Sequence, residues 1–264
     1  MSVIITRPEA DAAPWVRQLS ERGHEVRALP LIEISTAPDP VPLRQAWQHL
    51  KRYQAVMFVS GNAATQFAAV QGADAFSRWT DIAPRTRAWG TGPGTRQALL
   101  RAGLAAAQID APDAGQFDSE ALWNVVKHRV RAGEPVLIVR GGDAQSTASV
   151  ATPGAGRDWL ANALRDAGVD VDFVVAYARA VPQWSPAQIA LAQVAAQDGS
   201  LWLFSSAEAI GNLRQLLPQQ DWGSARALTT HPRIARAARE AGFGVVRESR
   251  PGLQEVIASI ESQT

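Results

Sequence analysis

The sequence has no cysteine, only two tyrosines and only four histidines among its 264 residues. Without cysteine the chain has no thiolate nucleophile, no disulfide and no sulfur ligand for a metal ion. The histidines, His24, His49, His128 and His231, lie far apart and form no HxH or HxxxH pair of the kind that binds zinc. We therefore expect no metal site and no thiol chemistry.

The sequence also has no marked excess of charge of either sign and no long apolar run. Lys plus Arg total 26 against 25 Asp plus Glu, so a net charge of +1 gives no field that attracts a nucleic-acid backbone or an anionic membrane. No apolar run approaches the roughly 18 residues of a membrane span, and the run at 3–5 before Arg7 is too short for a secretory signal. We expect a soluble, cytoplasmic protein that binds neither nucleic acid nor membrane.

What the sequence contains instead is a recurring order of short apolar stretch, turn and helix. VIIT at 3–6 and VLIV at 136–139 are each followed by a helical pattern that ends at a glycine, Gly23 or Gly168. Strand-like stretches then return at 24–34 and 169–180. Alternation of strand and helix is typical of parallel sheets, so the predicted fold class is α/β.

The same pattern of apolar stretch, turn and helix occurs twice in the chain. AVMFVSGNAA at 55–64 matches SLWLFSSAEA at 200–209, which places Ser60 on Ser205, and RAWGTGPGTRQALLRAG at 87–103 matches RALTTHPRIARAAREAG at 226–242. We infer an internal duplication of an α/β unit of about 130 residues.

The positions of the prolines predict how the two copies are divided into domains. The stretch at 131–135 is an ordinary helix-to-strand turn, whereas Pro-rich stretches at 35–42 and 180–186 follow the return strands. If these stretches are the linkers, residues 1–35 join 181–264 in one discontinuous domain, and 36–180 form an inserted second domain. Such an arrangement predicts two extended linkers and a ligand cleft between the domains.

A set of short motifs, taken in order, resembles the uroporphyrinogen-III synthase family over nearly the whole chain. The motifs are an opening strand running into TRP, PLIEI, FVSGNAA, a G-x-x-T turn before a helix, an RG turn, a strand ending in a tyrosine, and HPRIARAAREAG. Two departures stand out. The segment at 143–156 is longer than the usual Gly-rich turn, and the second copy has His231 to Ile234 where the first has the turn ending in Thr95.

The resemblance implies two α/β domains joined by two linkers, with hydroxymethylbilane, a linear tetrapyrrole, as substrate and no cofactor. The implied reaction is cyclisation with inversion of ring D and loss of water. It also implies a tyrosine in the cleft. We further expect a monomer, in transient contact with the preceding enzyme of the pathway.

Tyr177 is the candidate for that tyrosine. It ends the apolar strand before the second linker, where an α/β sheet presents its ligand crevice. A phenol, with a reference pKa of about 10, is a proton donor at neutral pH and can assist departing hydroxide. Taken without the resemblance, an aromatic residue at this place is a structural cap of the sheet edge, and Tyr53 is expected to be structural in either case.

Substrate carboxylates require backbone N–H groups at helix N-termini and a few Ser or Arg contacts. Residues that follow predicted strands, or begin the next helix, offer these groups. The candidates are Arg7, Ser60, Gly61, Asn62, Thr95, Arg140, Gly141, Ser205 and Ser206. Each serine is equally expected to be a helix N-cap, which is compatible with ligand contact, and a lone arginine is often a surface ion pair.

Other functions have weaker support. GTGPGT at 90–95 with Asp110 twenty residues after Gly90 resembles a dinucleotide turn, but Thr95 stands where the fingerprint has its third glycine. GGDAQST at 141–147 lacks the Gly-Lys pair of a phosphate loop. The remaining alternative is a two-lobe protein that binds an anionic small molecule without catalysis, since fold alone does not decide function. Tyr177 argues against it, because the first copy has no aromatic residue at the equivalent place.

Overall fold

The computed structural model describes residues 2–72, 74–113, 117–143 and 155–262. The long segment noted above lies almost wholly outside them. The described chain forms two compact units, which we call unit 1 (Met1–Glu33 with Ala180–Thr264) and unit 2 (Ile34–Arg179). These limits differ by one or two residues from the expected 1–35 with 181–264, and 36–180. That each unit is an independent domain stays a prediction.

Unit 1 is built on a five-stranded sheet in the order β11-β10-β9-β1-β2, and its strand pairs are parallel. Val3 of β1 lies between Val26 of β2 and Leu201 of β9. The strands are β1 (Ser2–Ile5), β2 (Glu25–Ala28), β9 (Leu201–Phe204), β10 (Arg226–Thr229) and β11 (Val245–Glu248). The helices are α1 (Glu9–Glu21), α8 (Pro186–Ala195), α9 (Ala207–Leu216), α10 (Pro232–Glu240) and α11 (Leu253–Glu261).

The three central strands, β1, β9 and β10, are covered on both faces, whereas the edge strands β2 and β11 are largely exposed. Helices α1 and α11 bury Trp15 and Ile257 against Val3 and Leu203 on one face. On the other face, Trp202 packs in a group of aromatic rings with Phe204, Trp222 and Phe243. Strands buried on both faces are the reason these stretches read as continuous apolar runs in the sequence.

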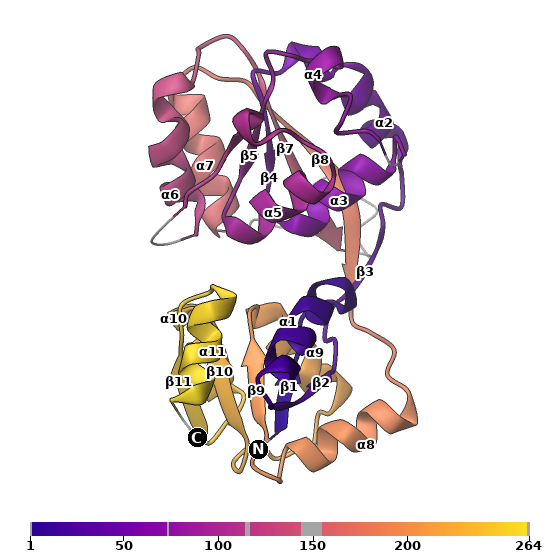
Figure 1. Ribbon diagram of the computed structural model, residues 1–264, viewed down its shortest axis with the longest axis vertical. Helices are drawn as coiled ribbons and strands as arrows, with labels where there is room; N and C mark the ends of the chain where they lie inside the picture. Colours follow the sequence, from indigo (N-terminus) through magenta and orange to yellow (C-terminus); the bar gives the residue numbers. More distant parts are fainter. Residues whose placement is uncertain (1, 73, 114–116, 144–154, 263–264) are drawn as a thin grey trace. The chain divides into compact units, whose positions relative to one another are not determined.

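Unit 2 is built on a six-stranded sheet in the order β3-β8-β7-β4-β5-β6. The strands are β3 (Glu33–Thr36), β4 (Ala55–Phe58), β5 (Arg87–Gly90), β6 (Ile109–Asp110), β7 (Val136–Asp143) and β8 (Val171–Ala180). The helices are α2 (Val41–Gln48), α3 (Gly61–Ala69), α4 (Trp79–Ile82), α5 (Pro93–Arg101), α6 (Ser119–Val126) and α7 (Ala155–Asp166), with short 3-10 helices at Leu50–Arg52, Ala106–Gln108 and Lys127–Arg129. Figure 1 shows the sheet with α6 and α7 on one face and α2 to α5 on the other.

The two sheets have the same topology, which confirms the α/β fold class and supports the duplication. The order β11-β10-β9-β1-β2 corresponds, strand for strand, to β6-β5-β4-β7-β8. Each sheet therefore combines strands from the first half of the chain with strands from the second. Crossovers of this kind need helices that pack back on the sheet, as the sequence pattern indicated.

The register corrects one detail of the repeat. Arg87 lies opposite Ala55, and its counterpart Arg226 lies opposite Leu201, so Ala55 is equivalent to Leu201 and not to residue 200. Ser60 therefore corresponds to Ser206. The match to Ser205 was wrong by one residue, because sequence similarity alone does not show which residues are paired in a sheet.

The return stretch at 24–34 is also not one strand. It divides into β2, in the sheet of unit 1, and β3, which lies beside β8 in unit 2. Between them Leu29 and Leu31 are fully buried and donate backbone hydrogen bonds to carbonyl groups at the end of β1, while Pro30 has no N–H to donate. The limits between the units fall at the start of β3 and the end of β8, beside the Pro-rich stretches at 35–42 and 180–186, and that these stretches are the linkers stays a prediction.

Candidate functional site

Tyr177 lies on β8 beside a β-bulge. Up to Arg140 the strands β7 and β8 pair in step, but Gly141 then pairs with Tyr177, so Ala176 is an extra residue on β8. One extra residue turns the following side chains to the other face of the sheet. Phe173 packs on the α6/α7 face, and strict alternation would send Tyr177 there too; the bulge places Tyr177 in the core of the α2 to α5 face instead.

Gly141 lies directly against the ring of Tyr177. A Cβ atom at position 141 would be 2.5 Å from Cζ of the ring and 2.9 Å from its hydroxyl oxygen. Real Cβ atoms do not approach other atoms so closely, so only glycine fits under the ring as it stands. Gly141 therefore supports one face of the ring, and Tyr177 is only 5% exposed.

The hydroxyl of Tyr177 meets the N-terminus of α3. Ser60 is the N-cap of this helix, and its Oγ accepts a hydrogen bond from the backbone N–H of Ala63 at 3.2 Å. The same Oγ lies 3.1 Å from the hydroxyl oxygen of Tyr177. Gly61 and Asn62 form the first turn of α3, where N–H groups have no acceptor within the helix. One serine therefore joins the predicted tyrosine to a predicted anion-binding turn.

Thr95 is buried in the first turn of α5, and its hydroxyl oxygen is 3.3 Å from that of Thr91. Thr91 in turn donates a hydrogen bond to the carbonyl oxygen of Val59, at 3.4 Å, just beyond β4. Thr91 is half-buried at the same sheet edge and was missed by the sequence reasoning. Its position directly after a predicted strand is the signal that could have identified it.

Arg140 does not follow its strand as expected. It lies inside β7, which continues to Asp143, and its side chain is 8% exposed. The guanidinium stacks on the ring of Phe173, with 4.7 Å between its Cζ and the ring centroid. The arginine is thus held on the α6/α7 face, whereas Tyr177 lies on the other.

In unit 1, Arg7 and Ser205 lie at one edge of the sheet. Arg7 is two residues beyond β1, and Ser205 directly follows β9. These two strands are adjacent and parallel, with Ile5 opposite Leu203, so both residues follow the carboxyl ends of neighbouring strands. Among the described residues, neither Nε of Arg7 nor Oγ of Ser205 has a hydrogen-bond partner, although both atoms are buried. Buried polar atoms without partners are uncommon in proteins.

The guanidinium of Arg7 is held against Trp15, 4.2 Å from the ring centroid. Burial lowers the pKa of Arg7 to about 10, and the nearby carboxylate of Asp11 acts in the opposite direction. The side chain therefore remains a cation at neutral pH, in surroundings that raise the cost of leaving it unpaired.

Two helices begin at the same edge of unit 1. The Ser206 hydroxyl caps α9 and accepts from the N–H of Glu208 at 3.2 Å. Nδ1 of His231 caps α10 and accepts from the N–H of Arg233 at 3.1 Å. His231 thus caps a helix, which agrees with the expectation that the histidines are solvated or capping residues.

The alternative for GTGPGT at 90–95 has no support in the structure. Asp110, which would bind a ribose in a dinucleotide site, is buried and bound by two arginines. Arg87 Nη2 lies 2.6 Å from Asp110 Oδ1, and Arg129 Nη1 lies 2.7 Å from the same atom. Its carboxylate is therefore occupied within the protein.

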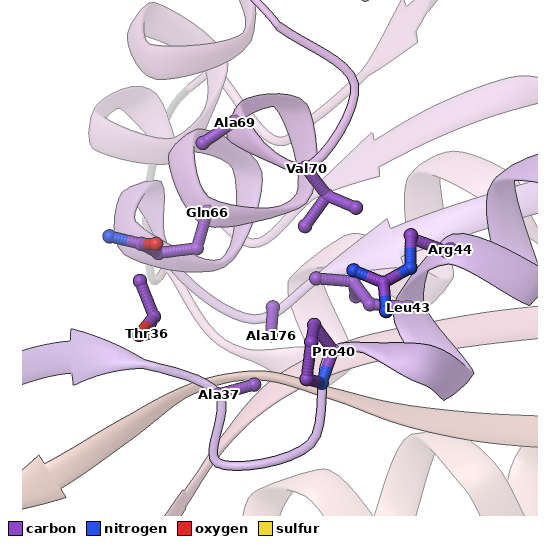
Figure 2. A pocket seen from close by; sticks show the side chains of 9 residues that line it. All are labelled: Thr36, Ala37, Pro40, Leu43, Arg44, Gln66, Ala69, Val70 and Ala176. Carbon is purple, nitrogen blue, oxygen red and sulfur yellow. The ribbon is translucent and has the colours of Figure 1, made fainter.

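A pocket of about 320 Å³ opens on unit 2 beside the strand that carries Tyr177. Figure 2 shows Arg44 and Gln66 on opposite sides of it with Ala176, the bulge residue, between them. The other lining residues are Thr36, Ala37, Pro40, Leu43, Ala69 and Val70. This volume is at the lower end of the range for small-molecule sites, so the pocket is much too small for a whole tetrapyrrole.

Over the described part of the chain, no group of three or more His, Cys, Asp or Glu side chains is arranged to hold a metal ion. Within the same residues, no helix has the length and apolar character that crossing a membrane requires.

A family model described as uroporphyrinogen-III synthase HemD matches residues 13–258. The chain belongs to the uroporphyrinogen-III synthase family. A curated relative from Escherichia coli K12, named uroporphyrinogen-III synthase, is 26% identical over 252 residues and is covered to 92%, as is this chain. The resemblance stated from the motifs is therefore confirmed.

Solved structures agree in fold. Uroporphyrinogen-III synthetase from Helicobacter pylori 26695 matches with a TM-score of 0.56 at 15% identity, covering 100% of both chains. A mutant uroporphyrinogen III synthase from the extremely thermophilic bacterium Thermus thermophilus matches with a TM-score of 0.53 at 16% identity, covering 99% of this chain and 98% of the other. Family membership makes the chain an enzyme of tetrapyrrole biosynthesis, a cyclising lyase, and the non-catalytic binding protein is not favoured.

Proposed function

We propose that the substrate of this lyase is hydroxymethylbilane, and that Tyr177 assists loss of its terminal hydroxyl. In this reaction the electron-rich pyrrole expels hydroxide to give an azafulvene-like cation. The far ring then closes through its substituted carbon, which gives a spiro intermediate and an inverted ring D. Because closure at the free carbon is easy without an enzyme, orientation is the larger task, and few strong catalytic groups are needed.

The observation that carries the role of Tyr177 is the β-bulge. The bulge and Gly141 hold the phenol beside Ser60 at the N-terminus of α3, although strict alternation would send it to the opposite face. Bulges that re-aim a side chain are frequent next to active sites. The phenol donates its proton to the departing hydroxide and becomes a phenolate, while water is released.

The substrate carboxylates bind at the strand ends of both units. In unit 1 the supporting observations are the charged Arg7 and the unpaired hydroxyl of Ser205, with Ser206 at the adjacent helix start. In unit 2 they are the first turns of α3 and α5. The residues proposed there are Gly61, Asn62, Thr95 and, through its backbone N–H group, Ser60, with Gly141 as the seat of the catalytic ring. Arg140 is not among them, because its guanidinium stacks on Phe173 on the opposite, α6/α7 face.

We also propose that the protein is a cytoplasmic monomer that needs no cofactor and meets the preceding enzyme of the pathway only transiently. The absence of cysteine fits a reducing compartment. Sedimentation analysis at micromolar concentration, alone and with that enzyme, tests the monomer and the transient contact; a stable dimer would contradict the first.

The activity is tested by incubating the purified protein with freshly prepared hydroxymethylbilane, oxidising the product and separating the porphyrin isomers. Isomer III is expected to dominate without added cofactor. Isomer I alone, formed at the uncatalysed rate by folded protein, would refute the proposed substrate and reaction.

The role of Tyr177 is tested by Tyr177→Phe. Removing one hydroxyl and no ring atoms should lower turnover about 10- to 100-fold with little change in stability. Tyr53→Phe is the matched control, because the Tyr53 hydroxyl binds Asp172 at 2.9 Å and lies outside the proposed site. Wild-type turnover in Tyr177→Phe would remove Tyr177 from the mechanism.

A further inference from the structure

We infer that Ser60 is a positioning residue for Tyr177: its hydroxyl donates a hydrogen bond to the phenol oxygen and so leaves the phenol proton free for the departing hydroxide. This inference rests on the proposed catalytic role of Tyr177. It assigns Ser60 a role that differs from contact with a substrate carboxylate.

The hydrogen bond that Ser60 already accepts leaves its hydroxyl hydrogen available for donation to Tyr177. A serine hydroxyl has one hydrogen to donate and two lone pairs. Oγ of Ser60 accepts from the N–H of Ala63 at 3.2 Å, which uses one lone pair and fixes the side chain at the helix N-terminus. The hydroxyl hydrogen remains, and the oxygen of Tyr177 is 3.1 Å away.

The alternative direction would oppose the reaction. If Tyr177 donated to Ser60, its proton would be held between two protein oxygens and would have to break that bond before reaching the substrate. With Ser60 as donor, the phenol oxygen accepts and its own hydrogen is available. A phenol oxygen that accepts a hydrogen bond is also a better donor, since hydrogen bonds in a chain polarise one another.

The proton and electrons balance through the step. The C–O bond of the hydroxymethyl group breaks with its electron pair on oxygen, the phenol proton joins that oxygen, and water leaves. The hydroxyl of Ser60 now donates to a phenolate, which is a stronger, charge-assisted bond. Ring D first bonds through its substituted α-carbon, which gives the spiro intermediate, and the bond from that carbon to the neighbouring methylene bridge then breaks. The methylene carbon bonds to the free α-carbon of ring D, which loses its proton, and this proton returns to the phenolate.

The geometry restricts Tyr177 to this partner. Gly141 supports the ring from one side, and the bulge sets the face on which it lies. Among the described residues the structure gives the hydroxyl of Tyr177 one hydrogen-bond partner, Ser60. In unit 1 the equivalent capping serine, Ser206, accepts from the N–H of Glu208, and neither of the two tyrosines of the chain belongs to that unit.

The test uses the full-length protein and a double-mutant cycle. Ser60→Ala should lower kcat about 10-fold, the loss expected for one hydrogen bond, with little change in KM. In the Tyr177→Phe background the same substitution should leave kcat unchanged, because the phenol oxygen is already absent. Ser60→Thr keeps a hydroxyl and should restore at least half of the turnover.

Ser60→Ala also removes a helix cap, so a control must separate the two effects. Asp118→Ala removes the N-cap of α6, whose carboxylate accepts from Ala121 N–H at 2.8 Å and touches no tyrosine. Both substitutions should lower the Tm by a similar few degrees, because each removes one cap. Asp118→Ala should do so without lowering kcat.

A spectroscopic measurement separates this inference from the proposed function. The chain has only two tyrosines, so labelling the hydroxyl-bearing ring carbon gives two NMR signals, assigned with Tyr53→Phe. Ser60→Ala should shift the Tyr177 signal and leave that of Tyr53 in place. An unmoved Tyr177 signal, or an equal loss of kcat in both backgrounds of the cycle, would overturn the positioning role. Wild-type turnover in Tyr177→Phe would instead refute the proposed function.

Discussion

The contact between Gly141 and Tyr177 offers a substitution, Gly141→Ala, that perturbs the site without removing any functional group. Gly141 is not among the glycines with positive φ, so alanine is compatible with its backbone conformation. The new methyl group would lie 2.5 Å from Cζ and 2.6 Å from Cε2 of the ring. Ordinary van der Waals contact begins at 3.4 Å. The substitution therefore acts on the ring of Tyr177, whose atoms are the nearest to the new methyl group.

The size of the effect follows from these distances. The ring must move by about 1 Å to restore ordinary contact, and its hydroxyl moves with it, away from its position 3.1 Å from Ser60. A displacement of about 1 Å in a positioned catalytic group can lower the rate about 100-fold. Overpacking of this kind costs roughly 1–3 kcal/mol of stability. We expect the folded variant to form isomer III about 100-fold more slowly.

The assay is the initial rate of isomer III formation from hydroxymethylbilane, with a thermal unfolding curve for each variant. Gly142→Ala is the matched control, because its methyl group would lie 3.0 Å from Cγ1 of Val175 and would not touch the tyrosine. It should cost some stability and leave turnover within about twofold. Equal rates for the two variants, or a wild-type rate in Gly141→Ala, would refute the reasoning that Gly141 seats the catalytic ring.

Three further substitutions test other parts of the molecule. Asp110→Asn leaves two arginines without their shared carboxylate, so it should lower the free energy of unfolding by about 1–3 kcal/mol. Urea titration measures this loss, and the isomer ratio should not change. Arg7→Gln should raise KM for hydroxymethylbilane about 10-fold with a smaller effect on kcat, since it removes a cation from the edge of unit 1; an unchanged KM would contradict carboxylate binding there. Burial and the hydrogen bond to Asp172 raise the pKa of Tyr53 to about 12, so its stabilising contribution should be complete below about pH 10 and lost as the pH rises to about 12. The difference in unfolding free energy between wild type and Tyr53→Phe should shrink over that interval, and a constant difference would show that Tyr53 ionises alike in both states.

The fold class and the duplication could be predicted because local patterns in the sequence indicate both. Apolar stretches of four residues, helices ended by Gly23 or Gly168, and prolines at Pro93 and Pro232 mark the elements in each copy. The structure begins α5 at Pro93 and α10 at Pro232. Such signals depend on neighbours along the chain, and sequence alone contains them.

Pairing between distant strands could not be predicted in the same way. The equivalence of Ser60 with Ser206 depends on the register of β4 with β5 and of β9 with β10, and sequence similarity placed it one residue away. The division of 24–34 into two strands in different sheets likewise depends on which sheet each half joins. Register is set by tertiary packing, so a local pattern leaves it open.

The sequence contains a partial signal for the β-bulge that orients Tyr177. Gly141 and Gly142 interrupt a strand-like stretch, and glycine within a strand often marks a bulge or a close approach of another group. Both features are present here. The same two glycines explain why the sequence predicts Arg140 to follow its strand: consecutive glycines favour a turn, whereas the strand continues to Asp143.

The exchange of strands between the halves of the chain determines the order in which the protein can be completed on the ribosome. Unit 2 is one continuous segment, so all of its strands have been synthesised by residue 180. Val3, in contrast, pairs with Leu201, which is 198 residues later. At about 5–20 residues per second, β1 waits about 10–40 s for this partner, during which α1 and β2 have no complete sheet to pack against. The segment that carries Arg7 therefore acquires its final surroundings only after all of unit 2 has been synthesised, and until then its unpaired strand is exposed to aggregation.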